Sequence, residues 1–395
     1  MKICGIIAEY DPFHLGHAYH LDAARKSSGA DAVAVAMSAS FVQRGYPAMF
    51  DKWTRAKCAL ASGADIVFEL SALGSLQSAE GFASAGVKLL NEIGATSLSF
   101  GCETPDITFL SSVADVLINE PENYRAYLKE SLSAGHSFVK SRGEALKKYL
   151  SLDSDKVSAI NKPNNILAIE YLKAIKRYAP TLSPLPIKRK GSGYHENSLS
   201  DKLASASAIR KGILANSDIL SYVPKACYEL LKEQIDLGNI RVLNDFSESI
   251  FNSLIKLNKE GIALLPDVSE GLENKIFSSL KSHPNDLDEF INAIKSSRYT
   301  KTRINRILIN ALIGITKEAI LKFNQSPPQY IKVLGIKKAS KHLLSYISKK
   351  ASCPIIYSAS NIKNEFLDLD ILATNLYLLK SKTFNRDYTE RLIEV

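Results

Sequence analysis

Two histidines in the tetrapeptide His14-Leu15-Gly16-His17 are the strongest chemical signal in this 395-residue sequence. They follow an apolar run, Ile3-Cys4-Gly5-Ile6-Ile7, and open a segment with helical character. A helix begins with free backbone N–H groups and the positive end of its dipole, which suits a phosphate group. Glycine lets the phosphate approach the backbone, and imidazoles can donate hydrogen bonds to charge that develops during displacement at phosphorus. The pattern predicts a phosphate site at a strand-to-helix junction, with His14 and His17 as its catalytic residues.

A second segment, Leu203-Ala204-Ser205-Ala206-Ser207-Ala208-Ile209-Arg210, reads as the start of another helix. Ser205 or Ser207 would cap this helix, and Arg210 would reach phosphates from its first turn. Alone this signal is weak, because serine and alanine are common at helix starts.

Four further polar residues follow predicted strands. Gln43 and Arg44 would face the same crevice by topology, as phosphate or acyl contacts or as loop-stabilising groups. Lys52 and Arg55, on a helix that Asp51 would cap, are weaker candidates for phosphate contacts.

The elements that must position these residues alternate between strand and helix. Apolar runs predict strands at 3–7, 32–37, 66–70 and 96–100, and helical patterns predict helices at 18–26, 52–61 and 79–91. Fully apolar strands separated by helices indicate a parallel sheet covered on both faces. We therefore predict a doubly wound α/β domain whose ligands bind beyond the carboxyl ends of the strands.

The remaining chain reads as mainly helical. A last strand of the first domain is expected at 182–188, and residues 303–315 form a strongly amphipathic pattern. Strands predicted at 330–334 and 355–358 flank a helix at 338–350, which indicates a small terminal α/β unit. This gives two parts: residues 1–215, carrying the candidate site, and a mainly helical region, residues 216–395.

The excess of positive charge lies in one block. Between Phe290 and Asn364 there are 14 lysines and arginines and a single acid, Glu318, although the net charge of the whole chain is only +9. Such a block attracts polyanions by releasing their condensed counterions, unless it is simply a solvated face. Two groups within it are candidate RNA-backbone contacts, with Tyr299 as a stacking surface: Arg298, Lys301, Arg303 and Arg306, and Lys332, Lys337, Lys338 and Lys341.

Other features exclude several classes of protein. The five cysteines are scattered and form no CxxC pair, which argues against a disulfide framework and a cysteine-built zinc site. The N-terminus lacks the features of a signal peptide, and no apolar stretch is long enough to span a membrane. We expect a cytoplasmic protein; the sequence does not indicate its oligomeric state.

The motifs together resemble a known family. HLGH is similar to the HxGH signature of the nucleotidyltransferase superfamily, and the 203–210 segment is similar to its second signature. More closely, GIIAEYDPFHLGHAYHL, MSASFVQRGYPAMFDKWTRA, GADIVFEL, FGCE, KPNNILAIEYLKA and YIKVLGIKKASKHLL resemble the bacterial tRNA(Met) cytidine acetate ligase family, in order and over nearly the whole length. The resemblance implies a Rossmann-like nucleotidyltransferase domain that activates acetate as acetyl-adenylate with ATP. The acetyl group then passes to N4 of the wobble cytidine of elongator tRNA(Met).

The resemblance also assigns residues. Its ATP-binding loop matches Ile7, Ala8, Glu9, Tyr10, Asp11, Pro12, Phe13, His14, Leu15, Gly16, His17, Ala18, Tyr19 and His20. Further ATP-binding positions match Gly101, Asn164 and Arg189, with Ser207 and Arg210 from the second signature. The tRNA contacts would be Arg298, Lys301, Arg303, Arg306, Lys337 and Lys338.

Mg²⁺ would enter as the complex with ATP, with no prosthetic group and no assigned protein ligand; Glu9, Asp11 and Glu103 are weak candidates. The chain departs from the family pattern at Asp11, where Asn is usual, and at Lys190. The sequence does not indicate how either departure affects the reaction. A ligase with a small-molecule acceptor, and an RNA-binding protein that has lost catalysis, remain alternatives.

Overall fold

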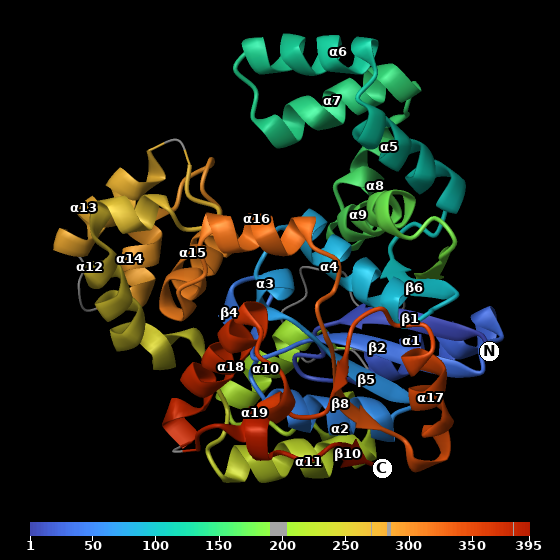
Figure 1. Ribbon diagram of the computed structural model, residues 1–395. Helices are drawn as coiled ribbons and strands as arrows, with labels where there is room; N and C mark the ends of the chain where they lie inside the picture. The colour runs from blue at the N-terminus through green and yellow to red at the C-terminus, as the bar shows by residue number, and fades with distance from the viewer. Residues whose placement is uncertain (190–203, 270, 283–285, 382) are drawn as a thin grey trace.

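A mixed sheet of eight strands forms the centre of the computed structural model, which describes residues 1–189, 204–269, 271–282, 286–381 and 383–395 (Figure 1). The strand order is β10-β8-β5-β2-β1-β6-β7, with β9 paired to β8. The strands are β1 (Ile3–Ala8), β2 (Ala32–Ser38), β5 (Ile66–Leu70), β6 (Ser97–Cys102), β7 (Ser183–Lys188), β8 (Ile331–Ile336), β9 (Ile355–Ile356) and β10 (Ile393–Glu394). All pairs in this sheet are parallel except β5 with β8.

Helices cover both faces of the sheet, as its apolar strands predict. In β1, Cys4 and Ile6 join one core with helices α1 and α2, while Ile3 and Ile7 join a second core with α4 and α9. Successive residues of a strand point to opposite faces, so a fully apolar strand needs cover on both. The helices of this first half are α1 (Leu15–Ser28), α2 (Lys52–Ala61), α3 (Ala72–Ser75), α4 (Ala79–Glu92), α5 (Ile107–Asn119), α6 (Glu122–Ser133), α7 (Phe138–Leu150), α8 (Ser154–Ile160), α9 (Pro163–Tyr178) and α10 (Ala206–Leu214).

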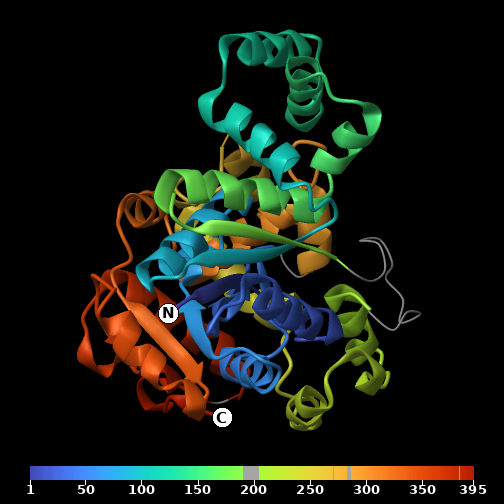
Figure 2. The same cartoon turned by 90° about the vertical axis from the view of Figure 1, so that its right-hand side faces the viewer.

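The α6–α7 hairpin stands away from the sheet in both views (Figures 1 and 2). A smaller hairpin, β3 (Phe41–Val42) and β4 (Tyr46–Pro47), follows β2 and carries Gln43 and Arg44 in its turn.

Six α-helices lie between α10 and β8 in the described residues: α11 (Lys225–Asp236), α12 (Ser247–Ala263), α13 (Leu272–Ser282), α14 (Leu287–Ile294), α15 (Lys301–Ile313) and α16 (Lys317–Gln325). Helices α12–α15 group to the left of the sheet in Figure 1, whereas α11 packs against α2, and α16 against α3 and α4. The end of the chain contributes α17 (His342–Ser348), α18 (Glu365–Leu378) and α19 (Arg386–Thr389). Short 3₁₀ helices lie between them: η1 (Leu220–Tyr222), η2 (Leu243–Phe246), η3 (Lys338–Ser340), η4 (Ala359–Asn361) and η5 (Leu379–Ser381).

The strands expected in a terminal α/β unit are present, but they extend the main sheet. Strand β8 pairs antiparallel with β5, and β10 then pairs with β8. The two halves of the chain therefore share one sheet.

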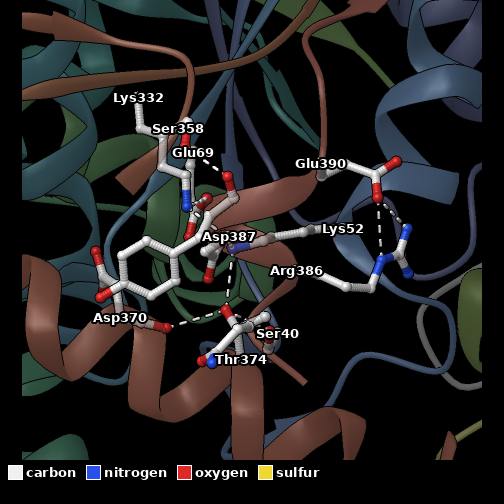
Figure 3. Close-up of polar contacts among 12 residues, drawn as sticks. Ser40, Lys52, Glu69, Lys332, Ser358, Asp370, Thr374, Arg386, Asp387 and Glu390 are labelled. Carbon is white, nitrogen blue, oxygen red and sulfur yellow. Dashed lines mark hydrogen bonds and ion pairs between the residues drawn. The ribbon is translucent and has the colours of Figure 1, made fainter. Parts of the chain in front are cut away.

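A buried cluster of charges joins these halves (Figure 3). Lys52 Nζ donates to Glu69 Oε1 at 2.8 Å and to Asp387 Oδ1 at 2.6 Å, and Lys332 Nζ pairs with both of the same carboxylates. All four side chains are at most 3% exposed. Burial opposes charge on Asp387, but the two ammonium groups outweigh it and lower its pKa. The sequence-based expectations for Lys52 at a phosphate and for Lys332 at RNA are wrong, because both ammonium groups are buried within this cluster.

Candidate active site

A cleft of about 550 Å³ opens at the carboxyl ends of β1, β6 and β7. Strand β1 lies between β2 and β6, and the chain passes from one side of β1 to the other, so the strand order reverses here. This is where doubly wound sheets bind their ligands. The walls come from the loop after β1, the first turns of α1, α9 and α10, the end of β7, and helix α15.

His14 and His17 line the cleft at the start of α1. His14 is the N-cap, and its Nδ1 accepts from Gly16 N at 3.0 Å, while His17 Nδ1 accepts from His14 N at 3.3 Å. The rings stack with centroids 3.7 Å apart. Since each Nδ1 accepts a hydrogen bond, the proton of each neutral ring resides on Nε2. A side chain at Gly16 would lie 2.8 Å from His14 Cε1, so glycine is required by the packing of the histidine itself.

His14, His17 and His20 are neutral near pH 7. Burial, reinforced by Arg189 and Arg210, lowers the pKa of His14 to about 3. Burial and then His14 lower the pKa of His17 well below its usual value, and burial lowers the pKa of His20 to about 4. His20 Nε2 is 2.9 Å from Ser99 Oγ. His14 and His17 thus offer Nε2–H donors without a fixed positive charge.

Positive charge comes instead from basic residues distributed around the cleft. Those that line it are Arg44, Lys188, Arg189, Arg210 and Arg306. Its two acids are already engaged: Glu9 accepts from Gln43 N at 2.8 Å, and burial raises the Glu9 pKa. The cleft therefore suits an anion with several charges.

Asp11 holds Arg210 in place. Its Oδ2 lies 3.3 Å from Arg210 Nη1, and its backbone oxygen accepts from the same nitrogen at 2.5 Å. Asp11 Oδ1 accepts from Met49 N at 2.7 Å, and the side chain is buried. The departure at Asp11 thus adds an ion pair behind the site; Lys190 lies outside the described residues.

Gly101, Asn164 and Arg189 come together near the carboxyl ends of β6 and β7. The side chain of Arg189 passes over Gly101, where an added Cβ would be 3.3 Å from Arg189 Cγ, and its Nη1 donates to Asn164 Oδ1 at 3.4 Å. Glu103 Oε1 accepts from Asn164 Nδ2 at 2.7 Å, and Oε2 accepts from Asn165 N at 2.9 Å. The Glu103 carboxylate, absent from the sequence-based site except as a weak metal candidate, therefore orients Asn164 by capping α9.

Most residues of the predicted ATP-binding loop line the cleft. They are Ile7, Ala8, Glu9, Tyr10, Asp11, His14, Gly16, His17, Tyr19 and His20. Pro12, Phe13, Leu15, Ala18 and Ser207 are not among the lining residues; Phe13 is buried, and Ser207 lies in the first turn of α10 after its N-cap, Ser205. Gln43 and Arg44 line the cleft as expected, whereas sequence reasoning missed Lys188, whose basic neighbour Arg189 was the available signal.

Arg55 has a structural role. Its Nε donates to Phe50 O at 2.9 Å, and its Nη1 donates to Glu9 O at 2.6 Å and to Ser38 O at 2.9 Å. The guanidinium is fully buried and fixes the loop after β1, so the suggested phosphate contact is wrong.

The basic residues that were predicted to contact RNA lie in different environments. Lys301 lies 3.4 Å from Asp288, Arg303 packs over the buried Tyr299 ring, and Arg306 is buried at the cleft. Arg298 and Lys338 are exposed, and Lys337 is half-buried. Tyr299 is 8% exposed, so it does not offer an open stacking surface.

Among the described residues, no cluster of three or more His, Cys, Asp or Glu side chains has the arrangement of a metal site. Every helix there is too short or too polar to cross a bilayer.

Comparison with known proteins decides the family. The model of the HIGH Nucleotidyl Transferase family matches residues 1–391. The tRNA(Met) cytidine acetate ligases of Acetivibrio thermocellus and Clostridium perfringens are each 39% identical to the chain, covering 100% and 98% of it and the same shares of their own lengths. The chain belongs to the tRNA(Met) cytidine acetate ligase family.

Two solved structures of Thermotoga maritima TmcAL agree with this assignment over the full length. The form bound with alpha-thio ATP is 31% identical, with a TM-score of 0.90, and covers 100% of this chain and 99% of its own. The apo form is 32% identical, with a TM-score of 0.92 and complete coverage of both chains. The α/β nucleotidyltransferase-like fold is therefore established from β1 to the C-terminal strands.

Proposed function

We propose that this chain is an ATP-dependent ligase that acetylates N4 of the wobble cytidine of elongator tRNA(Met). Full-length relatives at 38–40% identity carry the name tRNA(Met) cytidine acetate ligase. The observation that carries the proposal is the pair of neutral imidazoles, stacked at the start of α1, in a cationic cleft beyond a parallel sheet. The same fold binds alpha-thio ATP in the Thermotoga maritima structure.

In the first step, the acetate carboxylate attacks the α-phosphorus of ATP, and pyrophosphate leaves to give acetyl-adenylate. The Nε2–H groups of His14 and His17 donate to the α-phosphate oxygens as charge develops on them. Arg189 and Arg210 balance the triphosphate from either side. Acetate is itself the nucleophile, so no side chain forms a covalent intermediate. Mg²⁺ arrives bound to the ATP phosphates as part of the substrate.

Neutral histidines suit this task better than charged ones. An imidazolium would bind ground-state ATP tightly, whereas a neutral N–H donor strengthens mainly as the oxygens gain charge in the transition state. The burial that lowers the pKa of His14 also lowers the local dielectric constant, which strengthens hydrogen bonds to a developing charge. Rate acceleration then comes from fixed geometry and oriented dipoles.

In the second step, the cytidine N4 amino group attacks the acetyl carbonyl; AMP leaves and the amine loses a proton. A wobble base lies in a single-stranded loop, so it reaches a cleft with little unstacking. Arg298, Lys301, Arg303, Lys337 and Lys338 would contact the RNA backbone, and Arg306 would do so from within the cleft. These contacts would be mostly independent of sequence.

The experiment supplies ATP, labelled acetate and either elongator tRNA(Met) or no RNA. Pyrophosphate release followed by label on the tRNA is the expected result. Adenylate without transfer to tRNA would favour a ligase with a small-molecule acceptor instead, and no pyrophosphate release would refute the adenylation chemistry.

Histidine variants connect that result to the site. His17→Asn should lower the rate of pyrophosphate release by at least a hundredfold, because one oriented donor to a developing oxyanion is worth about 10²–10³ in rate. His342→Asn is the matched control, since this histidine is exposed on α17. Equal rates for the two variants would remove His17 from the mechanism.

A further inference from the structure

Helix α15 contributes a buried arginine to the cleft. Thr302 and Arg306 line it together with Arg44, although α15 belongs to the second half of the chain. The Arg306 side chain is only 9% exposed, and its Nε donates to Asp267 Oδ2 at 2.7 Å. Its two Nη atoms have no hydrogen-bond partner among the residues that the structure describes. A guanidinium has five N–H donors, and among the described residues only the Nε donor of Arg306 has a partner, so the group is suited to receive an oxyanion.

Asp267 contacts two arginines of α15. Asp267 adopts a left-handed backbone conformation, with φ of +63°, which a non-glycine residue rarely adopts. Its carboxylate holds Arg306, and its backbone oxygen accepts from Arg303 Nε at 2.9 Å. Arg303 is fixed further by Nη2 to Ser269 Oγ at 2.8 Å and by the Tyr299 ring, 5.3 Å away.

The two arginines form a row on one face of α15. Residues three apart on a helix are neighbours on its surface, about 4.5 Å apart along the axis. Arg306 lines the cleft, and Arg303, one turn nearer the N-terminus, does not. Thr302, next to Arg303 in the chain, also lines the cleft, so the row passes from the cleft lining at Arg306 to the edge of the cleft at Arg303.

The position of this row relative to the β3–β4 hairpin is fixed by close packing. Gly45, in the turn after Arg44, lies so near α15 that an added Cβ would be 2.3 Å from Arg306 N. The loop that carries Gln43 and Arg44 is thereby packed directly against the helix that carries Arg306.

We infer that Arg306 and Arg303 form a phosphate subsite for the RNA strand next to the base being acetylated, and that Asp267 is the residue that positions both. This rests on the proposed function. A row that runs from the cleft lining to its edge matches a polymer that inserts one nucleotide and continues beyond the cleft. An ATP triphosphate would lie inside the cleft, where His14, His17, Arg189 and Arg210 are among the lining residues.

The test compares Asp267→Asn, Arg306→Lys and Asp288→Asn. Asp288 on α14 is the matched control. Like Asp267, it pairs with a basic residue of α15, here Lys301, but neither residue lines the cleft. Affinity for a labelled anticodon stem-loop is measured without ATP or acetate, and KM values for tRNA and ATP are measured in the full reaction. Thermal melting checks that each variant is folded.

We expect Asp267→Asn and Arg306→Lys each to weaken stem-loop binding and to raise the ratio of the KM for tRNA to the KM for ATP about tenfold. Arg306→Gln should reduce the dependence of log affinity on log salt by about one, the value for one lost phosphate contact. Asp288→Asn removes only the partner of Lys301 and should not weaken stem-loop binding or raise this ratio. The double variant of Asp267 and Arg306 should be no worse than the single ones, because the two residues act as a unit.

Several outcomes would overturn the inference. A rise in the KM for ATP alone would place the subsite on the triphosphate, and equal losses with Asp288→Asn would indicate general destabilisation. Stem-loop binding is measured without catalysis, so these results are separate from a failure of the proposed function, in which the unsubstituted protein would not transfer acetate to tRNA.

Discussion

Replacing Gly45 by alanine should detach the nucleotide-binding half from α15. The added Cβ would lie 2.3 Å from Arg306 N, 2.5 Å from Asn305 C and 2.8 Å from Arg306 Cα. All three are backbone atoms of a buried helix, so no side chain can rotate away. Ordinary contacts between such atoms begin near 3.5 Å, and α15 would have to retreat by about 1 Å.

The expected loss in the free energy of unfolding of Gly45→Ala has two parts. Gly45 has a φ of +75°, and an L-residue in that region loses about 1 kcal/mol. Overpacking adds about 1–3 kcal/mol, giving a total of about 3 kcal/mol. Gly29→Ala is the matched control, because Gly29 has a φ of +56° but no atom within 4 Å of an added Cβ. Gly29→Ala should therefore lose only the part due to backbone conformation, about 1 kcal/mol.

Urea unfolding followed by circular dichroism and by the fluorescence of the single tryptophan, Trp53, measures both variants. Both substitutions reduce the freedom of the unfolded chain equally, so the difference between them isolates the contact with α15. In the folded Gly45→Ala protein, transfer to tRNA should fall further than pyrophosphate release. Equal stabilities for the two alanine variants would refute the close-packing argument.

Two further predictions concern charge. Burial, with Arg189 and Arg210 adding to it at His14, lowers the pKa of His14 to about 3, and burial likewise lowers that of His20 to about 4. The unfolded chain binds protons at these rings below about pH 6.5, and the folded chain does not. The stability they contribute is therefore present above pH 6.5 and is lost as the pH falls, by about 2 kcal/mol per ring at pH 5. Urea midpoints at pH 7.5 and 5.0 measure this loss, and His20→Asn should reduce it; an unchanged pH dependence would contradict the assigned shift. Lys332→Met should cost about 3–5 kcal/mol because it leaves Glu69 and Asp387 with one counter-charge, whereas Lys337→Met should change stability by less than about 0.5 kcal/mol. Thermal melts that ranked these two lysine variants equally would argue against the buried cluster.

The sequence predicted the parts of the fold that depend on local pattern. The strands near Ile3, Ala32, Ile66 and Ser97 lie within a residue or two of their expected bounds, since fully apolar runs between helices leave few alternatives. HLGH was also placed correctly at the start of α1, because a helix N-terminus after a buried strand is a local feature.

Long-range contacts could not be predicted from the sequence. Nothing near Ile331 indicates that its strand pairs antiparallel with β5, more than 250 positions earlier, because pairing partners are chosen by tertiary packing. Lys52 and Lys332 look like surface lysines for the same reason: only the assembled fold places two carboxylates between them. The burial of Arg306 at the cleft wall depends on Asp267 and Gly45, which lie in other segments.

The antiparallel pairing of β8 with β5 has a consequence for how such an enzyme can be divided or evolve. A fragment ending near residue 215 would expose the edge of β5 and would leave the Glu69 carboxylate facing only Lys52. Activation of the acid and capture of the RNA are thereby tied to one cooperative unit of folding. We therefore expect that neither half folds as an independent module, and that loss of the final strands would also abolish the ATP chemistry of the N-terminal half.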